Sequence, residues 1–295
     1  MTSVARIDAH MHVWDLAVRD QPWTAGDLAP LHRSFALADV ADERERAGIE
    51  GVVLVQTLAV PEETPELLML AGANTAVAGV VGWVDLTSAD VSERLCRLQA
   101  EPFGDRLVGI RHLVQGEADP RWLCRPDVRR GLFAVADAGL AYDLLILPHQ
   151  LGAAHETAAA IPELRFVVDH LAKPAIATGR IEPWATGLRA LGSLPNVTCK
   201  LSGMVTEADW TSWTVAQLRP YAESVLDAFG ADRVLFGSDW PVCTLAGSYD
   251  EVVRTAERLV EALDPAEREA VFGGAARAAY RLSPAARTSP GNAET

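Results

Sequence analysis

The chain has 295 residues, of which 49% are hydrophobic and 22% are charged, and its formal net charge is −14. This composition is typical of a globular protein with enough apolar sequence for a full core. The negative charge argues against binding to nucleic acid or to an anionic membrane surface, since both need basic patches. The four cysteines are scattered along the sequence, which predicts reduced thiols. We see no basic and apolar leader, and no apolar run approaches the roughly 20 residues of a membrane span. These features together predict a cytoplasmic protein.

The first predicted strand covers residues 4–12 and ends in His10-Met11-His12. Side chains alternate between the two faces of a strand, so the two imidazoles project in the same direction. Imidazole suits zinc, iron and manganese-like ions, but a metal site needs three or four ligands. A His-x-His pair alone is weak evidence, and we therefore expect partners at the ends of other strands.

Residues 13–30 combine Trp14 and Trp23 with two prolines and a glycine, which predicts a loop over the mouth of a site. Beyond this loop, helical segments alternate with short apolar strands. The predicted helices cover residues 38–47, 64–73, 88–99, 127–138, 152–161, 184–194, 215–229, 249–263 and 265–282. The strands after the first are predicted at residues 51–56, 77–84, 106–113, 140–147, 164–170, 197–201 and 233–237. Residues 283–295, rich in Ser, Pro, Ala and Gly, are predicted to be a flexible tail, which leaves one domain over residues 1–282.

The strands are apolar runs rather than alternating patterns, which indicates burial on both faces, as in a parallel sheet. Eight such strands alternating with helices predict an α/β protein with a single (β/α)₈ TIM barrel, regular or distorted, and a loop-rich mouth at the C-terminal face. An open doubly wound sheet is the alternative. No G-x-G-x-x-G follows the first strand, so a dinucleotide site has no support.

Polar side chains gather at the C-terminal ends of the predicted strands, which form the catalytic rim of a barrel. Five of the seven histidines are among them, while His32 and His155 are not. The residues of this rim are His10, His12, Arg111, His112, His149, His170 and Asp239, and Gln56 and Trp83 also end strands. Each of these residues alone has a structural explanation, such as capping a loop. Their shared placement indicates one active site.

The sequence resembles the amidohydrolase superfamily, in particular its branch of lactonase-like and decarboxylase-like members. The likeness rests on Ile-Asp-Ala-His-Met-His-Val-Trp-Asp at 7–15, Gly-Ile-Arg-His at 109–112, Val-Asp-His-Leu-Ala-Lys-Pro at 168–174, Lys-Leu-Ser-Gly at 200–203 and Phe-Gly-Ser-Asp-Trp-Pro at 236–241. The motifs span most of the chain, and the set in this order is specific where one motif would not be. The most similar members hydrolyse sugar-acid lactones, as fucono- and rhamnonolactonases do, or pyrone-dicarboxylate lactones.

The resemblance implies that His10 and His12 are a metal-binding pair. It implies that Asp239 ligates the metal and takes a proton from the attacking water, with His149 or His170 as a further ligand. The position where two-metal members have a bridging lysine or glutamate reads Arg111-His112 here. Neither residue can bridge two ions, so we expect at most one divalent ion, zinc before manganese. Some lactonases of this branch work without a metal, and that alternative stays open.

Opening a lactone requires an activated water, a polarised carbonyl and a stabilised oxyanion. One ion would lower the pKa of a bound water towards neutrality, and Asp239 would accept the proton. His170, if it is not a ligand, would orient the water or polarise the carbonyl, and Arg111 offers a fork of donors to substrate oxygens. The candidates for substrate binding are His112, Gln56, Trp83, Lys173, Lys200 and Trp14. Their structural alternatives are clear: Lys173 could neutralise Asp169, and Lys200 could serve an internal ion pair.

Two other functions stay open. One is a metal-dependent decarboxylase of a small unsaturated or aromatic acid, which would want a basic clamp for the carboxylate. The other is a non-catalytic barrel that binds a small polyol or acid, although such a barrel has no need to keep Asp239 opposite His10 and His12. In every case the partner is a small molecule, whose identity is set by loops that the sequence does not reveal. Assembly into a homo-oligomer is also left open.

Overall fold

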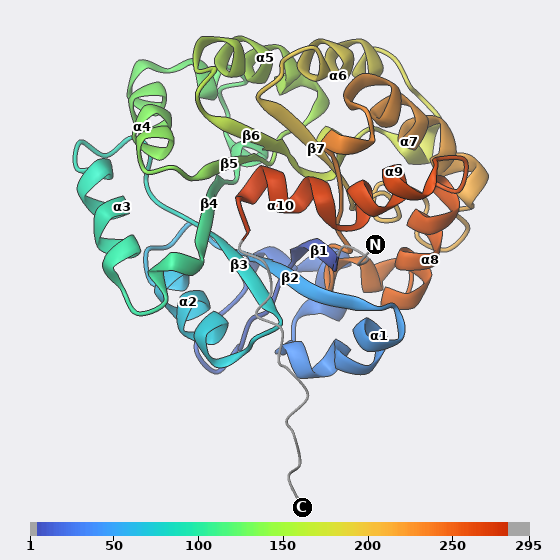
Figure 1. Cartoon of the computed structure of the whole chain (residues 1–295), viewed down its shortest axis with the longest axis horizontal. Coiled ribbons are helices and arrows are strands. Elements are labelled where there is room, and N and C mark those ends of the chain that lie inside the picture. Colours follow the sequence, from blue (N-terminus) through green and yellow to red (C-terminus); the bar gives the residue numbers. More distant parts are fainter. Residues whose placement is uncertain (1–4, 283–295) are drawn as a thin grey trace, which may run out of the picture.

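The computed structural model describes residues 5–282, and the predicted tail at 283–295 lies outside the described residues. Eight parallel strands form one sheet in chain order, surrounded by a ring of helices (Figure 1). The strands are β1 Arg6–Met11, β2 Ile49–Val55, β3 Val77–Gly82, β4 Leu107–His112, β5 Ala141–Leu144, β6 Arg165–Val168, β7 Val197–Leu201 and β8 Val234–Phe236. The predicted TIM barrel is therefore confirmed.

The barrel closes between β8 and β1 without a regular ladder of hydrogen bonds. Met11 and Trp240 form one isolated parallel bridge across this seam. Around it, the N–H of His12 donates to the carbonyl of Trp240 at 2.7 Å, and the N–H of Asp239 donates to the carbonyl of His10 at 2.9 Å. The barrel is thus nearly closed. The strand pair with the least regular hydrogen bonding, which we call the seam, is β1–β8, and both strands lead into predicted site residues.

The helices follow the strands as the sequence pattern predicts. They are α1 Ala41–Arg46, α2 Glu63–Ala73, α3 Val91–Ala100, α4 Pro126–Asp137, α5 Leu151–Ala160, α6 Trp184–Gly192, α7 Val215–Phe229, α8 Tyr249–Leu259, α9 Pro265–Glu269 and α10 Ala275–Tyr280. Side chains at the N-termini fix where two of them begin: the Thr214 hydroxyl accepts from the Gln217 N–H before α7, and Ser248 caps α8 in the same way. No helix among the described residues is long and apolar enough to cross a membrane.

Some predicted bounds are wrong, and the reason is local backbone geometry. The strand predicted at 140–147 ends at Leu144, and the strand predicted at 164–170 ends at Val168, where its pairing with β7 stops. After β5, the apolar Leu145 and Ile146 are buried but belong to no strand, so hydrophobicity overestimated that strand. After β6, Asp169 and His170 enter a 3₁₀ turn in which His170 has a φ of 50°. The helix predicted at 265–282 is divided into α9, a π-helical turn at Ala270–Gly274 and α10.

The apolar core has two parts. The larger one lies between the strands and the outer helices, and the smaller one fills the inside of the barrel. The inner part joins strand residues such as Val53, Val81 and Leu235 to Ala276 and Tyr280 of α10. In Figure 1, α10 crosses the middle of the ring of helices. Because α10 packs against the N-terminal side of the strands, this end is plugged and a site is left to the C-terminal end.

Candidate active site

Three side chains from the β1–β8 seam converge at the C-terminal end of the barrel. The Nε2 atoms of His10 and His12 lie 3.1 Å apart. One carboxylate oxygen of Asp239, Oδ1, lies 3.7 Å from His10 Nε2 and 3.4 Å from His12 Nε2. All three side chains are buried or almost buried. The alternation of β1 brings the two imidazoles together, as the His-x-His spacing predicts.

Asp8 holds the backbones that carry these residues. Its Oδ1 accepts a hydrogen bond from the N–H of His10 at 3.1 Å and another from the N–H of Ser238 at 2.9 Å. The first bond lies within β1 and the second crosses to the end of β8. One buried oxygen therefore fixes both the strand of His10 and the residue before Asp239.

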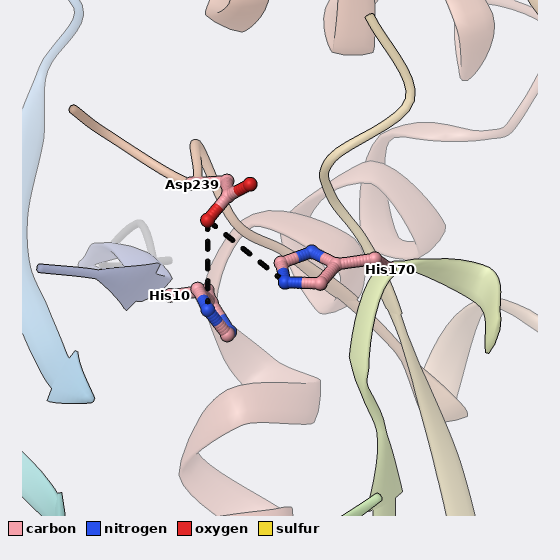
Figure 2. A group of neighbouring side chains, drawn as sticks. All are labelled: His10, His170 and Asp239. Atoms are coloured by element: carbon pink, nitrogen blue, oxygen red, sulfur yellow. Dashed lines mark ion pairs between the residues drawn. The ribbon is translucent and has the colours of Figure 1, made fainter. Parts of the chain in front are cut away.

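His170 completes the cluster from β6. Its Nε2 lies 3.9 Å from Asp239 Oδ1, and Figure 2 shows the carboxylate facing both His10 and His170. The residue begins a turn of four residues with positive φ, from His170 (φ 50°) to Lys173 (φ 51°), a region that L-residues avoid. Such strain is stored at functional sites when the surroundings enforce it.

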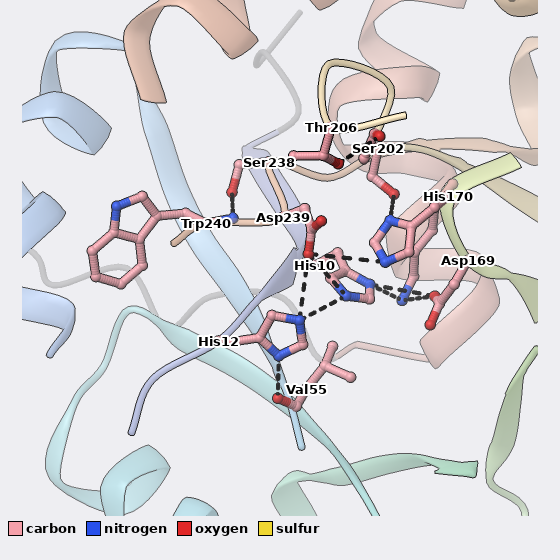
Figure 3. A network of polar contacts seen from close by, with 12 residues as sticks. His10, His12, Val55, Asp169, His170, Ser202, Thr206, Ser238, Asp239 and Trp240 are labelled. Carbon is pink, nitrogen blue, oxygen red and sulfur yellow. Dashed lines mark hydrogen bonds and ion pairs between the residues drawn. The ribbon is translucent and has the colours of Figure 1, made fainter. Parts of the chain in front are cut away.

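Ser202 and Gly203, at the end of β7, orient the His170 ring. The Ser202 hydroxyl lies 2.9 Å from His170 Nδ1 (Figure 3). Gly203 has a φ of +65°, and a Cβ there would lie 2.7 Å from the same Nδ1. The site therefore requires a glycine at this position both for its backbone conformation and for the space it leaves to the imidazole.

Hydrogen bonds fix the tautomer of His12 but not that of His10. The Nδ1 of His12 lies 2.7 Å from the carbonyl oxygen of Val55, which can only accept, so Nδ1 carries the proton and Nε2 keeps its lone pair. The Nδ1 of His10 lies 3.0 Å from the donor Lys200 Nζ and 3.3 Å from the acceptor Asp169 Oδ1. His10 can therefore carry its proton on either nitrogen.

Burial and mutual charge set the ionisation of the cluster. Burial lowers the pKa of His10 well below its usual range, with Lys200 adding to the effect, and burial lowers the pKa of His170 to about 4. Burial by itself would raise the pKa of Asp239, but the facing imidazoles outweigh it and hold that pKa below its usual value. Near neutral pH the site thus combines the ionised carboxylate of Asp239 with neutral His10 and His170.

A buried ionic network lies beneath His10. Lys200 Nζ is 2.6 Å from Asp143 Oδ2 and 2.9 Å from Asp169 Oδ1, and Arg111 Nη1 is 3.0 Å from Asp169 Oδ2. Burial opposes ionisation of Asp169, but Lys200, His10 and Arg111 hold its pKa well below the usual range. The Tyr280 hydroxyl of α10 donates to Asp143 at 2.7 Å. Two cations and two carboxylates therefore balance inside the barrel.

The donor set fits one divalent ion. Ligand atoms of His10, His170 and Asp239 all lie within 4.8 Å of one another. The lone pair of His12 Nε2 lies beside the same Asp239 oxygen. Three imidazole nitrogens and a carboxylate oxygen are ligands that zinc prefers. Because the two cations beneath the cluster are neutralised by two other carboxylates, the cluster keeps the negative charge of its own carboxylate.

The structure does not bring every predicted residue to this cluster. His149 is exposed in a turn at Pro148–Gln150, and in the described part of the chain it makes no hydrogen bond or ion pair with the cluster. His170, rather than His149, is the histidine that joins His10 and Asp239. Trp14 packs against Trp23 and Phe35, and its indole N–H donates to the Arg33 carbonyl at 2.6 Å, so it holds the loop down.

Two further residues predicted to bind substrate instead support the site from within. The Gln56 side chain donates to the Arg111 carbonyl at 3.0 Å, and the Gln56 carbonyl accepts from the Arg111 guanidinium. Lys200 is fully buried in the ionic network, so its structural alternative is the one that the geometry favours. Arg111 Nη1 also lies 3.4 Å from His10 Nε2, which places this cation against the cluster rather than in open solvent.

The other candidates lie in half-buried surroundings near the strand ends. The Trp83 indole donates to His112 Nδ1 at 3.1 Å, and His112 Nε2 lies 2.8 Å from Glu117. The His112 ring stacks on Trp122 with 4.4 Å between ring centroids. Lys173 lies 3.3 Å from Glu207, not beside Asp169 as its structural alternative assumed, because Lys200 already occupies that place.

Sequence reasoning missed the residues that hold the site together. These are Asp8, Asp143, Ser202 and Tyr280. Sequence reasoning also missed Glu207 as the partner of Lys173. One signal was available: Asp143 lies inside an apolar strand, where a carboxylate requires a buried partner.

The comparisons with known proteins agree with this geometry. A family model described as amidohydrolase matches residues 7–282. The chain belongs to the amidohydrolase family. It is 40% identical over 281 residues to an L-fucono-1,5-lactonase of Burkholderia ambifaria, covering 94% of this chain and 96% of the relative. It is 39% identical over 289 residues to an L-fucono-1,5-lactonase of Burkholderia multivorans, with the same coverage of 94% and 96%.

A solved structure agrees as well. A crystal structure of an amidohydrolase from Burkholderia multivorans with bound zinc has a TM-score of 0.89 and 38% sequence identity, and the match covers 94% of this chain and 99% of that one. Together with the two lactonases, this identifies the chain as a hydrolase of the amidohydrolase family.

Proposed function

We propose that this protein hydrolyses L-fucono-1,5-lactone or a closely related sugar-acid lactone to the open acid. The observation that carries the proposal is the ionised Asp239 held against His10, His12 and His170 at the open end of the barrel. This arrangement supplies a base and several imidazoles in one buried place, which is what ester hydrolysis needs. The two relatives named as L-fucono-1,5-lactonases match nearly the whole chain and support the substrate class.

Asp239 is the proposed general base. A water between its carboxylate and the lactone carbonyl gives a proton to Asp239 as its oxygen attacks the carbonyl carbon. When the ring C–O bond breaks, the ring oxygen takes that proton and becomes the free hydroxyl of the product. The low pKa of Asp239 keeps the carboxylate ionised, and therefore ready for each turnover, throughout the neutral range.

The histidines are proposed to hold the water and the carbonyl, and to hold one divalent ion, zinc before manganese. His10, His12, His170 and Asp239 would be its ligands, and when bound the ion supplies a Lewis acid that acidifies water and polarises the carbonyl. His10 can move its proton between its nitrogens because Nδ1 faces both Lys200 and Asp169. The same residues can thus hold an ion or, with N–H turned inward, the carbonyl oxygen, and hydrolysis without a metal stays within reach.

The remaining residues have supporting roles in the proposal. Arg111, kept in place by Gln56 and Asp169, positions His10 and adds positive charge where the oxyanion develops. Trp83 and His112 are proposed to border the substrate from β3 and β4. A decarboxylase is not favoured, because the two buried cations are each bound to a carboxylate and neither is free to clamp an acid. A cytoplasmic location remains a prediction.

The test is lactone opening measured with a pH indicator and corrected for spontaneous hydrolysis. We expect turnover of L-fucono-1,5-lactone by the unmodified protein and a loss of about 10²- to 10⁴-fold in kcat for Asp239→Asn. Asp227→Asn, the same change at an exposed position of α7, is the matched control and should keep full activity. A protein that accelerates no lactone in a panel of sugar-acid lactones, or an Asp239→Asn variant with undiminished kcat, contradicts the proposal.

A further inference from the structure

Lysine is used in this chain at only two positions. The sequence contains 26 lysines and arginines, and all but Lys173 and Lys200 are arginines. Lys200 lies in the buried network, and Lys173 lies three residues after His170. A chain that uses arginine everywhere else therefore has its two compact ammonium groups at the active site. The two side chains are not interchangeable, since an ammonium is a small point donor and a guanidinium a planar fork.

Lys173 forms an ion pair with Glu207 across two loops that follow site-bearing strands. Lys173 ends the left-handed turn after β6, and its N–H donates to the His170 carbonyl at 2.7 Å. Glu207 lies in the loop after β7, where its N–H donates to the Gly203 carbonyl at 3.3 Å. The Nζ–Oε1 distance is 3.3 Å, and the side chains are 25% and 26% exposed. The pair is thus attached through its backbone to His170 itself and to Gly203, which leaves space for the His170 ring.

The charges of this pair affect pKa values at the proposed catalytic centre. Burial raises the pKa of Glu207, Lys173 opposes that rise, and the charge of Asp239 adds to it. Burial is the main cause of the low pKa of His170, and Lys173 contributes to it. These directions agree with the backbone hydrogen bonds that tie Lys173 to His170 and Glu207 to Gly203.

The pair keeps hydrogen-bonding capacity unused. Within residues 5–282, the side chains of Lys173 and Glu207 form no other ion pair or hydrogen bond. An ammonium has three donors and a carboxylate accepts at two oxygens, so most of this capacity is left over. An ion pair that is one-quarter exposed to solvent also contributes little to holding two loops together. A structural role alone does not account for its place or its chemistry.

We propose that Lys173 and Glu207 form a subsite that binds neighbouring hydroxyl groups of the lactone ring, which rests on the proposed lactonase function. A hydroxyl both donates and accepts, so one hydroxyl can accept from the Lys173 ammonium while its neighbour donates to the Glu207 carboxylate. A vicinal diol then bridges the pair beside His170 and Asp239. The subsite selects polyhydroxylated lactones over plain ones, because an unsubstituted ring leaves both charges without partners.

The experiment compares L-fucono-1,5-lactone with δ-valerolactone, which has the same ring size and no hydroxyl groups. For Lys173→Met and Glu207→Gln we expect kcat/KM to fall about 10- to 100-fold on the sugar lactone, the value of a hydrogen bond to a charged group. On δ-valerolactone we expect a change of less than about threefold. Equal losses on both lactones, or no loss on the sugar lactone, overturn the subsite.

The Lys173→Arg variant distinguishes binding of the substrate hydroxyls from a role in holding the two loops together. Arginine keeps the ion pair, so a fastening role predicts that both thermal stability and kcat/KM are retained. The subsite predicts retained stability with reduced kcat/KM on the sugar lactone only, because the planar group does not fit the diol. Arg189→Met, which breaks an exposed pair with Glu182 at α6, is the matched control and should change neither. Full recovery of kcat/KM by Lys173→Arg overturns the proposal.

Ligand binding gives a readout that does not need turnover. Calorimetry with L-fuconate, the open acid, should show binding that weakens about 10- to 100-fold in Lys173→Met, while 5-hydroxypentanoate binds both proteins alike. Unchanged L-fuconate affinity overturns the subsite. Failure of the proposed function is a different result, because there the unmodified protein opens no lactone.

Discussion

The buried charges beneath His10 allow a quantitative prediction of stability. Lys200 is fully buried between Asp143 and Asp169, at 2.6 and 2.9 Å, and Arg111 pairs with Asp169 at 3.0 Å. Lys200→Met removes one of two cations and leaves Asp143 without a counter-charge. Removing one partner of a buried ion pair costs about 3–5 kcal/mol, and we expect the free energy of unfolding to fall by that amount.

The double variant Lys200→Met/Asp143→Asn restores the balance, because Arg111 and Asp169 still neutralise each other. The Tyr280 hydroxyl, which donates to Asp143, can donate to the amide oxygen of the asparagine as well. The double variant should therefore be more stable than Lys200→Met alone by roughly 2 kcal/mol or more, a coupling expected for groups in direct contact.

The assay is urea unfolding followed by tryptophan fluorescence, with the four proteins of the cycle compared at one pH. Arg97→Met, which removes an exposed partner of Glu93, is the control and should leave stability unchanged within error. The reasoning is refuted if Lys200→Met costs less than about 1 kcal/mol, or if the double variant is as unstable as the sum of the single changes.

Three other predictions concern the histidines and their surroundings. In metal-free protein, burial lowers the pKa of His170 from an ordinary 6.5 to about 4, so folding keeps this imidazole neutral. Its contribution to the free energy of unfolding is therefore full above pH 6.5 and falls by roughly 3 kcal/mol as the pH drops towards 4. Urea unfolding of His170→Asn should lack this loss. Gly203→Ala should lower kcat about 10- to 100-fold by displacing the His170 ring, whereas Gly179→Ala, at a similar positive φ with open space around it, should not. His149→Ala should keep the zinc content of the purified protein, measured by plasma mass spectrometry, while His170→Ala should lower it; the reverse result would reinstate His149 as the ligand.

The fold was predictable because its signals are local. Apolar runs such as the one at 51–56 indicate strands buried on both faces, and their alternation with helices leaves few architectures. The barrel then places strand ends on one rim, which is why His10, His12 and Asp239 were found from the sequence before any contact was known.

The choice between His149 and His170 could not be made in this way, because both follow a strand. What separates them is the backbone after the strand: Pro148 leads into a turn that exposes His149, whereas His170 enters a left-handed turn. Four consecutive left-handed residues, none of them glycine, run against local preference and leave no sequence signal. The turn is enforced from elsewhere, for example by the Trp184 indole, which donates to the Leu171 carbonyl at 2.6 Å.

The seam between β1 and β8 shows why fold and site have to be considered together. The contacts that close the barrel there are few, and they involve the backbones of His10, His12, Asp239 and Trp240 and the carboxylate of Asp8. The same hydrogen bonds that complete the barrel therefore bring Asp239, the proposed base, to the two imidazoles. The cluster of His10, His12 and Asp239 cannot form until the last strand meets the first, because its members come from both ends of the chain. Asp8 acts on both strands at once, since one of its carboxylate oxygens accepts an N–H from β1 and another from the end of β8. A residue that the sequence presented only as part of a motif therefore links the closure of the barrel to the assembly of its site.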